Sequence, residues 1–561
     1  MGFLKQDAPV VDFAEWSKGT RSEKIKPMAR HWAEVGFGTP VVLHLFYVVK
    51  IALYIGLAYV IAAATDGVGF GGVTDWYNAP IVIEKVVLFT MLFEVVGLGC
   101  GFGPLNNRFR PPMGSILYWT RPQTIRLAPW PRIPLTGGDS RTLIDIALYV
   151  ALLVLLVIGL ASGPSAHGVI PQWEVWSILG VLAVLSLRDK VIFLAARGEV
   201  YVPLVIAFLF TEGNDTILAA KLTCMAIWLG AATSKLTRHF PFVISTMMSN
   251  NPVLRPRWIK RKFFQDFPED LRPGTPSRLL AHTSTAVEGL VPLALLFGNG
   301  WVITAAAIVM LCFHFGILSS IPMGVPLEWN VFMMFAITAL FVGHPHVGIT
   351  DASTPWPFVL FAVSAALVVL GNLFPRKISF LPGMRYYAGN WDVTLWCVKP
   401  SASAKIEEKV VSIASMPQAQ MAKYYGSPEN AQLYMYMGYA FRGFNSHGRA
   451  MFSLAHRAMA GLNEDEYILI DGERICSTAL GWNFGDGHMH NEQLIAALQL
   501  RCQFEPGEVR IVLIDAQPIH RQRQEYRLVD PATGEFERGY VDVADMVNRQ
   551  PWDDELPAHV Y

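Results

Sequence analysis

The sequence predicts a polytopic α-helical membrane bundle of roughly ten spans, one of them short or re-entrant, followed by a C-terminal cytosolic α+β domain. Of the 561 residues, 52% are hydrophobic and 16% are charged, a balance too apolar for an ordinary soluble enzyme. Apolar stretches of about 20 residues, the length of one membrane crossing, recur as far as residue 374. After Pro375 the hydrophobic runs shorten and charged residues become dense, as in a soluble domain.

The apolar stretches follow one another along the chain, and we interpret each as one span. They lie near 39–64, 79–103, 143–162, 172–196, 201–211, 216–236, 281–298, 301–321, 328–343 and 356–374. The stretch 201–211 is too short to cross, because about 11 residues of α-helix rise only about 16 Å, half of a hydrocarbon core of about 30 Å. We therefore expect a short or re-entrant helix there.

Lysine and arginine predict the orientation of the chain. They concentrate in the first 38 residues and in the connections 104–142 and 237–280. The alternate connections contain neither residue: 65–78, 163–171, 212–215, 299–300 and 344–355. Because connections rich in lysine and arginine stay in the cytosol, both chain ends are expected to be cytosolic. The charged N-terminal stretch lacks the features of a cleavable signal peptide, so we expect a multi-pass protein of a bacterial cytoplasmic membrane.

The organisation that follows has a cytosolic N-terminal tail (1–38), a transmembrane helical domain (39–374), an interfacial connecting segment (375–445) and a cytosolic α+β domain (446–561). The connecting segment interleaves aromatic and basic residues over 385–400, as a chain lying along lipid headgroups would. In the last region, helices are expected over 448–462 and 491–500, and strands over 466–478 and 508–517. Their order is that of an α+β domain and leaves room for a βαβ unit.

The loop 481–490 holds the densest polar cluster of the C-terminal region, with Asp486, His488 and His490. A His-x-His pair binds a metal ion when a third ligand joins it. Residues elsewhere that could supply this ligand are His447, His456 and Asp471. Glycine-rich turns before helices also use such residues as caps, and we favour this structural interpretation, with no metal. The cysteines show no paired spacing, and the zero formal net charge does not indicate a nucleic-acid partner.

Lys235 is the first candidate for a functional residue, because it closes a long apolar stretch in which an ammonium group is costly unless it is paired, hydrated or used. Neighbouring apolar stretches contain Glu288 and His314, and Lys221 lies in the same stretch as Lys235. A lysine in apolar surroundings loses its proton more easily and can act as a base. His314 would then orient a substrate oxygen or relay a proton, and Glu288 would balance the charge. The alternative is structural: Lys235 extends to the headgroups beside Arg238, and His314 bonds a backbone carbonyl.

Further residues are candidates for contacting a bound cofactor: Glu212, Asp215 and Trp228. Glu212 and Asp215 belong to the polar cluster TEGND (211–215), which follows the short apolar stretch. They line a pocket if that helix is re-entrant, because irregular backbone at membrane depth is tolerated only against protein or a water-filled cavity. An ordinary external hairpin turn is the alternative.

The segment WLGAATSKL (228–236) follows FLFTEGND (208–215) and ends an apolar helix in a lysine-leucine pair, and an apolar helix with one embedded histidine lies within 287–336. These features resemble the vitamin K-dependent γ-carboxylase superfamily, including its bacterial HTTM-type members. The resemblance implies that Lys235 is the base that deprotonates a reduced quinone and that His314 is the histidine of the next family segment. The stretch GNWDVTLW (389–396) is similar to the Trp-Asp stretch that follows the carboxylase's membrane region.

The likeness covers about residues 140–400 and departs from the family in two respects. The histidine-rich run expected after the Trp-Asp stretch is replaced by CVKPSASAK (397–405), and no large extracytoplasmic domain is expected that could hold a protein substrate. Peptide carboxylation is therefore not expected. The chain is also identified as a member of a narrower, uncharacterised family of bacterial transmembrane proteins of about this length.

These observations lead to two hypotheses. In the first, the helices enclose a lipid- or quinone-binding cavity, and the protein is a quinol-linked oxidoreductase or epoxidase-like enzyme with Lys235 as an intramembrane base. In the second, it is a non-enzymatic lipid-binding or lipid-handling protein, or an accessory subunit of a cell-envelope or respiratory assembly, and its cytosolic domain docks a protein partner. A transporter is disfavoured because no internal repeat is visible. The sequence indicates no oligomeric state.

Overall fold

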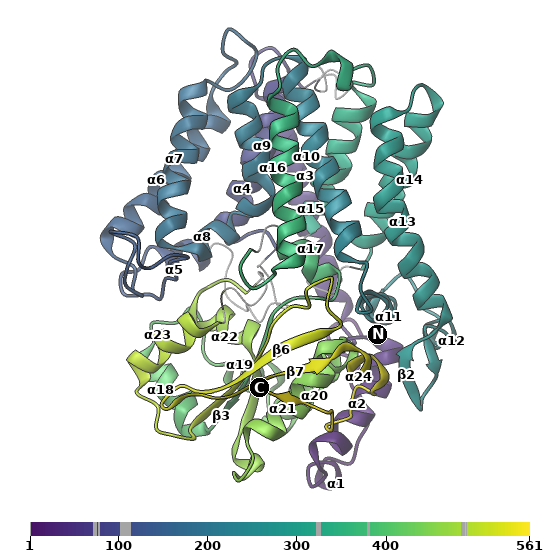
Figure 1. The fold of residues 1–561 in the computed structure, drawn as a ribbon, viewed down its shortest axis with the longest axis vertical. Helices are drawn as coiled ribbons and strands as arrows, with labels where there is room; N and C mark the ends of the chain where they lie inside the picture. The colour runs from purple at the N-terminus through teal and green to yellow at the C-terminus, as the bar shows by residue number, and fades with distance from the viewer. Residues whose placement is uncertain are drawn as a thin grey trace.

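Figure 1 shows a bundle of helices stacked on a domain that contains a β-sheet, with the two layers arranged along the longest axis of the molecule. The computed structural model describes residues 2–70, 76, 79–100, 114–320, 327–378, 382–483, 489 and 491–561. Within these ranges the chain is mostly helical, and its larger sheet is built from residues 393–560. The predicted helical bundle and the predicted sheet region near the C-terminus are both present.

Of the helices in the described ranges, 6 are long and apolar enough to cross a membrane. They are α3 (Val41–Ala63), α6 (Leu143–Ala161), α10 (Asn214–Ser234), α13 (Thr275–Phe297), α14 (Trp301–Leu318) and α16 (Trp356–Leu373). Most residues of α10 are buried, whereas less than a third of the residues are buried in each of the other long helices. Helix α10 is therefore the central helix of the bundle, as its contacts with α9, α13 and α16 also show.

The remaining predicted spans correspond to shorter helices, so the count of roughly ten is not confirmed. These are α4 (Pro80–Val95), α7 (Gln172–Arg188), α9 (Gly198–Phe210) and α15 (Leu327–Ala336), the last continued by a π-helical turn, η4 (Ile337–Val342). Helix α9 has 13 residues, which agrees with the short helix expected there. Helix α4 is buried on nearly all sides and carries Glu84, Lys85 and Glu94 inside an apolar sequence. Packing against protein explains why such a short, charged helix is stable in the bundle.

The C-terminal domain is built around a 6-stranded antiparallel sheet with the order β4-β3-β5-β6-β7-β8. The strands are β3 (Val393–Val398), β4 (Ile468–Asp471), β5 (Val509–Ile514), β6 (Arg523–Asp530), β7 (Gly534–Asp542) and β8 (His559–Val560). Its helices are α18 (Pro400–Lys409), α19 (Pro417–Tyr425), α20 (Pro428–Phe444), α21 (Ser446–Ala458), α22 (Gly472–Ala479), α23 (Glu492–Cys502) and α24 (Val543–Asn548). Because β4 and β5 both pair antiparallel with β3, they run parallel to each other with one strand between them. The domain therefore contains a split βαβ unit.

The helices expected over 448–462 and 491–500 and the strand over 508–517 are present as α21, α23 and β5. The strand expected over 466–478 is shorter, because Gly472 begins α22 with Asp471 as its N-cap. In the segment 385–400, residues 393–398 do not lie along headgroups, since they form β3, whose side chains are all buried. A strand covered on both faces is apolar throughout, so its aromatic residues resemble an interfacial segment in the sequence. The C-terminal domain thus includes much of the expected connecting segment 375–445.

The N-terminal residues fold against the C-terminal domain through α1 (Phe13–Trp16) and α2 (Arg21–Val35). Thr20 and Glu23 form a capping box that fixes the start of α2. The ring of Trp32 lies 4.9 Å from the ring of Phe444 on α20, and both side chains are fully buried. Arg21 donates a hydrogen bond of 3.1 Å to the carbonyl of residue 452 on α21. Residues 13–35 are thus a part of this layer and not a free tail.

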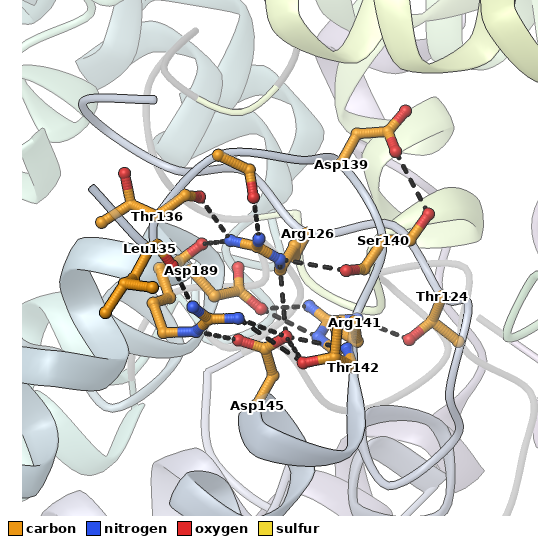
Figure 2. A network of polar contacts seen from close by, with 12 residues as sticks. Thr124, Arg126, Leu135, Thr136, Asp139, Ser140, Arg141, Thr142, Asp145 and Asp189 are labelled. Carbon is orange, nitrogen blue, oxygen red and sulfur yellow. Dashed lines mark hydrogen bonds and ion pairs between the residues drawn. The ribbon is translucent and has the colours of Figure 1, made fainter. Parts of the chain in front are cut away.

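A buried charge network joins the ends of α6 and α7 that face the C-terminal domain (Figure 2). Asp189 pairs with Arg141 at 2.7 Å, and Asp145 pairs with Arg188 at 2.6 Å and with Arg126 at 3.5 Å. These side chains are almost completely buried, apart from a small exposed part of Arg188. Several of the basic residues that predict the orientation therefore also hold the bundle together.

The same region attaches the C-terminal domain to the bundle. Arg501 on α23 pairs with Asp139 at 2.7 Å. The indole of Trp119 on α5 (Gly114–Trp119) donates to the carbonyl of Leu480 at 2.9 Å. The remaining short elements are α8 (Lys190–Ala195), α11 (Phe240–Asn250), α12 (Arg257–Arg261), β1 (Phe264–Asp266), β2 (Asp270–Pro273), η5 (Ile349–Asp351), α17 (Pro382–Tyr387) and η6 (Glu464–Glu466).

Candidate functional site

Lys235 and Glu288 form a buried ion pair at the end of the bundle that faces the C-terminal domain. Lys235 is the C-cap of α10, and Glu288 lies on α13. Their exposed fractions are 8% and 5%. The Lys235 ammonium group also lies 5.0 Å from the ring centre of Phe240 and 5.7 Å from that of Phe313, where the ring faces attract a cation. Lys235 therefore points into the protein, whereas the neighbouring Arg238 is exposed.

Small residues let α10 and α13 approach each other at this pair. A Cβ atom on Gly289 would lie 3.5 Å from the Cβ atom of Ala232, which is an ordinary van der Waals contact. Close packing of membrane helices typically depends on such small residues. The short distance between the two helix axes allows the Lys235 side chain to reach Glu288 without crossing solvent.

His314 on α14 is held as a neutral imidazole by its two hydrogen bonds. The indole N–H of Trp228, which can only donate, lies 3.1 Å from Nε2 of His314. Nδ1 of His314 lies 3.0 Å from the side-chain oxygen of Asn330 on α15, which can only accept. The proton of the ring is therefore on Nδ1, and Nε2 accepts. Trp228 and Lys235 are two helical turns apart on α10, which places them on the same face.

The three residues line one cavity of about 110 Å³, together with Trp228. Most of its wall is apolar, with Ile227, Ile244 and Ile317 among the contacting side chains. Arg197, Asn330 and Tyr387 add polar groups that were not expected from the sequence. An asparagine or tyrosine near a helix end gives no signal on its own, because such residues are common at membrane interfaces and helix caps.

Glu212 and Asp215 lie at the other end of α10 from Lys235. About 20 residues of helix separate Asp215 from Lys235, which corresponds to roughly 30 Å. The Asp215 carboxylate accepts hydrogen bonds from both the backbone and the side chains of Ser353 and Thr354. Glu212 is exposed and lies 3.9 Å from His167. The structure therefore does not bring these two residues to the cavity.

Other charged residues inside the bundle also have partners. Lys221 donates to the carbonyls of His344 and Val347, at 2.8 and 2.6 Å, and so fastens the connection after η4 to α10. Lys50 on α3 pairs with Glu328 on α15 at 2.9 Å. The sequence indicates that such charged residues need partners, but it does not predict which residues are the partners.

His239 lies four residues after Lys235 and connects this end of the bundle to the C-terminal domain. Its Nδ1 lies 2.5 Å from the hydroxyl of Ser446, and its Nε2 lies 2.7 Å from the side-chain oxygen of Gln517. Burial lowers the pKa of His239 to about 4, and the hydrogen bond to Gln517 only partly offsets this effect. The ring is therefore neutral at physiological pH.

The loop with Asp486, His488 and His490 lies outside the described residues. Within the part of the chain that the structure describes, no group of three or more histidine, cysteine, aspartate or glutamate side chains is placed to hold a metal ion. Of the residues considered as a third ligand, His456 contacts Glu464, and Asp471 pairs with Arg442.

Comparison with known proteins assigns the chain to a family without adding a function. No curated protein matches the sequence, and no solved structure matches it either. The family match covers residues 1–561 and shows no link to the γ-carboxylase superfamily or its HTTM-type members. The chain therefore belongs to the family described as transmembrane protein of unknown function (DUF3556).

Proposed function

We propose that the protein binds a lipid-soluble molecule with an acidic or hydrogen-bonding oxygen, such as a membrane quinol, beside Lys235 and Glu288. The observation that carries this proposal is the buried ion pair at the wall of an apolar cavity. Removing two charges from water costs free energy that their mutual attraction repays only in part. An ionisable residue inside a membrane bundle is by default a candidate for a binding or proton-transfer site, and this pair also lines a cavity.

The cavity suits the head of such a molecule. A dry protein cavity of about 150 Å³ can hold one benzene ring, and the cavity here measures about 110 Å³. A small outward movement of its apolar side chains would therefore admit one six-membered ring. The hydrocarbon tail of the ligand would lie outside the cavity, among the helices.

The ion pair could accept a proton from a bound hydroxyl group by two routes with the same outcome. In one, the Glu288 carboxylate takes the proton, and the Lys235 ammonium group stabilises the oxyanion that remains. In the other, the proton has already passed from Lys235 to Glu288, and the free amine of Lys235 takes the substrate proton. In both, the O–H bond breaks, its electron pair stays on the oxygen, and the pair ends as an ammonium group and a neutral carboxylic acid. His314, whose ring nitrogens are bonded to Trp228 and Asn330, forms part of the cavity wall beside the ligand.

A second candidate function is lipid binding without chemistry, as in a lipid-handling protein or an accessory subunit. This second function is favoured because the polar groups of the site already have partners. Lys235 and Glu288 pair with each other, and both ring nitrogens of His314 are hydrogen-bonded. Such a site needs no proton transfer to be stable. The two candidates predict the same bound molecule and differ in whether it is altered.

The test is the identity of the molecule that co-purifies with the full-length protein in a mild detergent, determined by mass spectrometry of the extracted lipids. We expect a quinone or a related lipid at close to one molecule per chain. The Lys235→Met/Glu288→Leu double variant should lose it, because the polar contacts are removed while no unpaired charge is left in the bundle.

Lys221→Met is the matched control. Lys221 is a buried lysine of the same helix, but it bonds two carbonyls away from the cavity. It should lower stability and leave the bound molecule in place. Retention of the molecule by the double variant would contradict the proposed site. Equal rates of quinol oxidation by an added oxidant with the wild type and with the double variant would favour binding without chemistry.

A further inference from the structure

A groove on the membrane-facing side of the bundle lies between α3 and α14, away from the cavity at Lys235. We call it the α3–α14 groove, and its volume is about 1030 Å³. Its apolar wall on α3 follows one face of the helix, because its residues recur three to four positions apart. They are Val48, Ile51, Ala52 and Ile55, and Phe315 and Leu318 of α14 stand in the same groove.

The apolar wall is shorter than one membrane leaflet. From Val48 to Ile55 it follows about 11 Å of helix, and half of a hydrocarbon core is about 15 Å. Val48, Ile55 and Phe315 are 50%, 49% and 64% exposed, so the groove offers apolar surface that protein does not cover. A lipid chain from one leaflet would cover this wall without crossing the membrane.

Basic side chains meet only at one end of the groove. Arg255, Arg257 and Lys260 line it there, in the connection between α11 and α13. Lys260 is buried and donates to the carbonyl of Ser249 at 2.5 Å, which holds its charge in place. Arg255 is exposed and has no ion pair with any residue that the structure describes. Its charge is therefore available to a ligand.

Two acidic residues, Asp7 and Glu34, line the same end, but the net charge of the lining residues is still positive. The Arg257 guanidinium lies 3.6 Å from Asp7 and 3.8 Å from Glu34, longer than a close ion pair. Glu34 is engaged more tightly by Arg261, at 2.5 Å. Three basic and two acidic lining residues give a formal charge of one positive unit, which complements a single phosphodiester.

A tryptophan marks this end as the headgroup level. Trp258 on α12 is 60% exposed, and the Lys262 ammonium group lies 4.8 Å from its ring centre. Exposed tryptophans next to lysines are typical of the boundary between hydrocarbon and headgroups. The basic end of the groove and the expected position of lipid phosphates therefore coincide.

We propose that the α3–α14 groove binds an anionic glycerophospholipid. Its phosphate lies against Arg255 and Arg257, and one acyl chain lies along the face of α3 from Val48 to Ile55. An apolar helix of a protein partner would require no basic cluster, and the wall is shorter than one leaflet. The proposal does not depend on a ligand at Lys235, because none of its residues line that cavity.

Native mass spectrometry of the full-length protein, titrated with phosphatidylglycerol or with zwitterionic phosphatidylcholine, tests the proposal. We expect tight binding of phosphatidylglycerol alone. The Arg255→Gln/Arg257→Gln variant should bind it about 30-fold more weakly, as expected for two lost charges near a phosphate. Lys262→Gln is the matched control, because it removes a charge from the same connection outside the groove.

A second variant tests the apolar wall. Ala52→Trp should fill the groove and abolish binding, whereas Leu57→Trp, at another exposed position of α3, should leave binding unchanged. Equal affinity for the two lipids, or equal loss with Lys262→Gln, would overturn the proposal. Competition by glycerol 3-phosphate at the lipid's own affinity would also overturn it, because the site would then recognise a soluble phosphate. The thermal unfolding midpoint of each variant shows whether it is folded.

Discussion

Two buried lysines of this bundle are stabilised by glutamates on other helices. Lys235 and Glu288 are 53 positions apart in the chain, and Lys50 is paired with a glutamate on a much later helix. A single replacement in such a pair leaves an unpaired buried charge, at a cost of about 3–5 kcal/mol, whereas removing both partners is often nearly neutral. The sequence identifies each charge as unusual, but the partner depends on packing between distant segments.

His239 should make the attachment of the C-terminal domain sensitive to pH. Its pKa falls from an ordinary value of 6.5 to about 4 in the folded protein because the ring is buried. Between these values the unfolded chain binds more protons, so stability is complete above pH 6.5 and decreases as the pH falls toward 4. The expected loss is on the order of 3 kcal/mol. Thermal unfolding in detergent at pH 7.5, 6 and 5 measures it.

His239→Gln is the control, because an amide can accept from Ser446 and donate to Gln517 but does not titrate in this range. The variant should show a flatter dependence on pH. Some dependence should remain, since burial also holds the pKa of His447 well below its usual range. Identical pH profiles for the variant and the wild type would refute the role of His239.

At the scale of helices and strands, apolar length and periodicity predicted most of the elements. Helix α10 and strand β5 lie where the sequence places them, because each is an apolar run of the right length with polar residues at both ends. Strand β3 was missed because a strand buried on both faces has no alternation of polar and apolar residues. The convergence of Lys235, Glu288 and His314 was expected as a hypothesis, while Asn330 and Arg197 were not, since only the packing of α9 and α15 brings them to the cavity.

The charge network at the ends of α6 and α7 predicts a large difference between two aspartates. Asp189→Asn should destabilise the protein by about 3–5 kcal/mol, because Arg141 would then be buried without a counter-charge. The asparagine can still cap α8, so the loss measures the charge and not the cap. Asp139→Asn, at the more exposed pair with Arg501, should cost less than about 1 kcal/mol. Unfolding midpoints followed by tryptophan fluorescence compare the two, and equal effects would contradict a buried network.

At the scale of the whole molecule, the basic connections and the C-terminal domain share one end, and Asp351 lies near the other. Asp139, in the connection after α5, contacts Arg501, and His239 contacts Gln517. By contrast, Asp215 contacts Ser353 and Thr354 at the far end of α10. The alternation of lysine and arginine seen in the sequence thus corresponds to the two ends of the bundle. Which end faces the cytosol is a prediction from the same residues.

Reporter fusions test this prediction. A fluorescent protein fused after Tyr561 should fluoresce in the cytosol, and alkaline phosphatase inserted near Asp351 should be active outside the cytoplasmic membrane. Fusions exchanged between the two positions should both be inactive. Phosphatase activity from the fusion after Tyr561 would reverse the orientation, and activity at both positions would contradict the separation of the two ends.

The packing of α2 on α20 has a consequence for how the molecule is made. Helix α2 is synthesised first, but its partner surface around Phe444 emerges only after every membrane helix. During synthesis the indole of Trp32 therefore lacks its contacts with Phe441 and Phe444 until some 400 more residues have been made. Contacts between such distant segments form late and slowly. Removal of α2, or of the chain from α20 onward, would therefore expose the same aromatic surface.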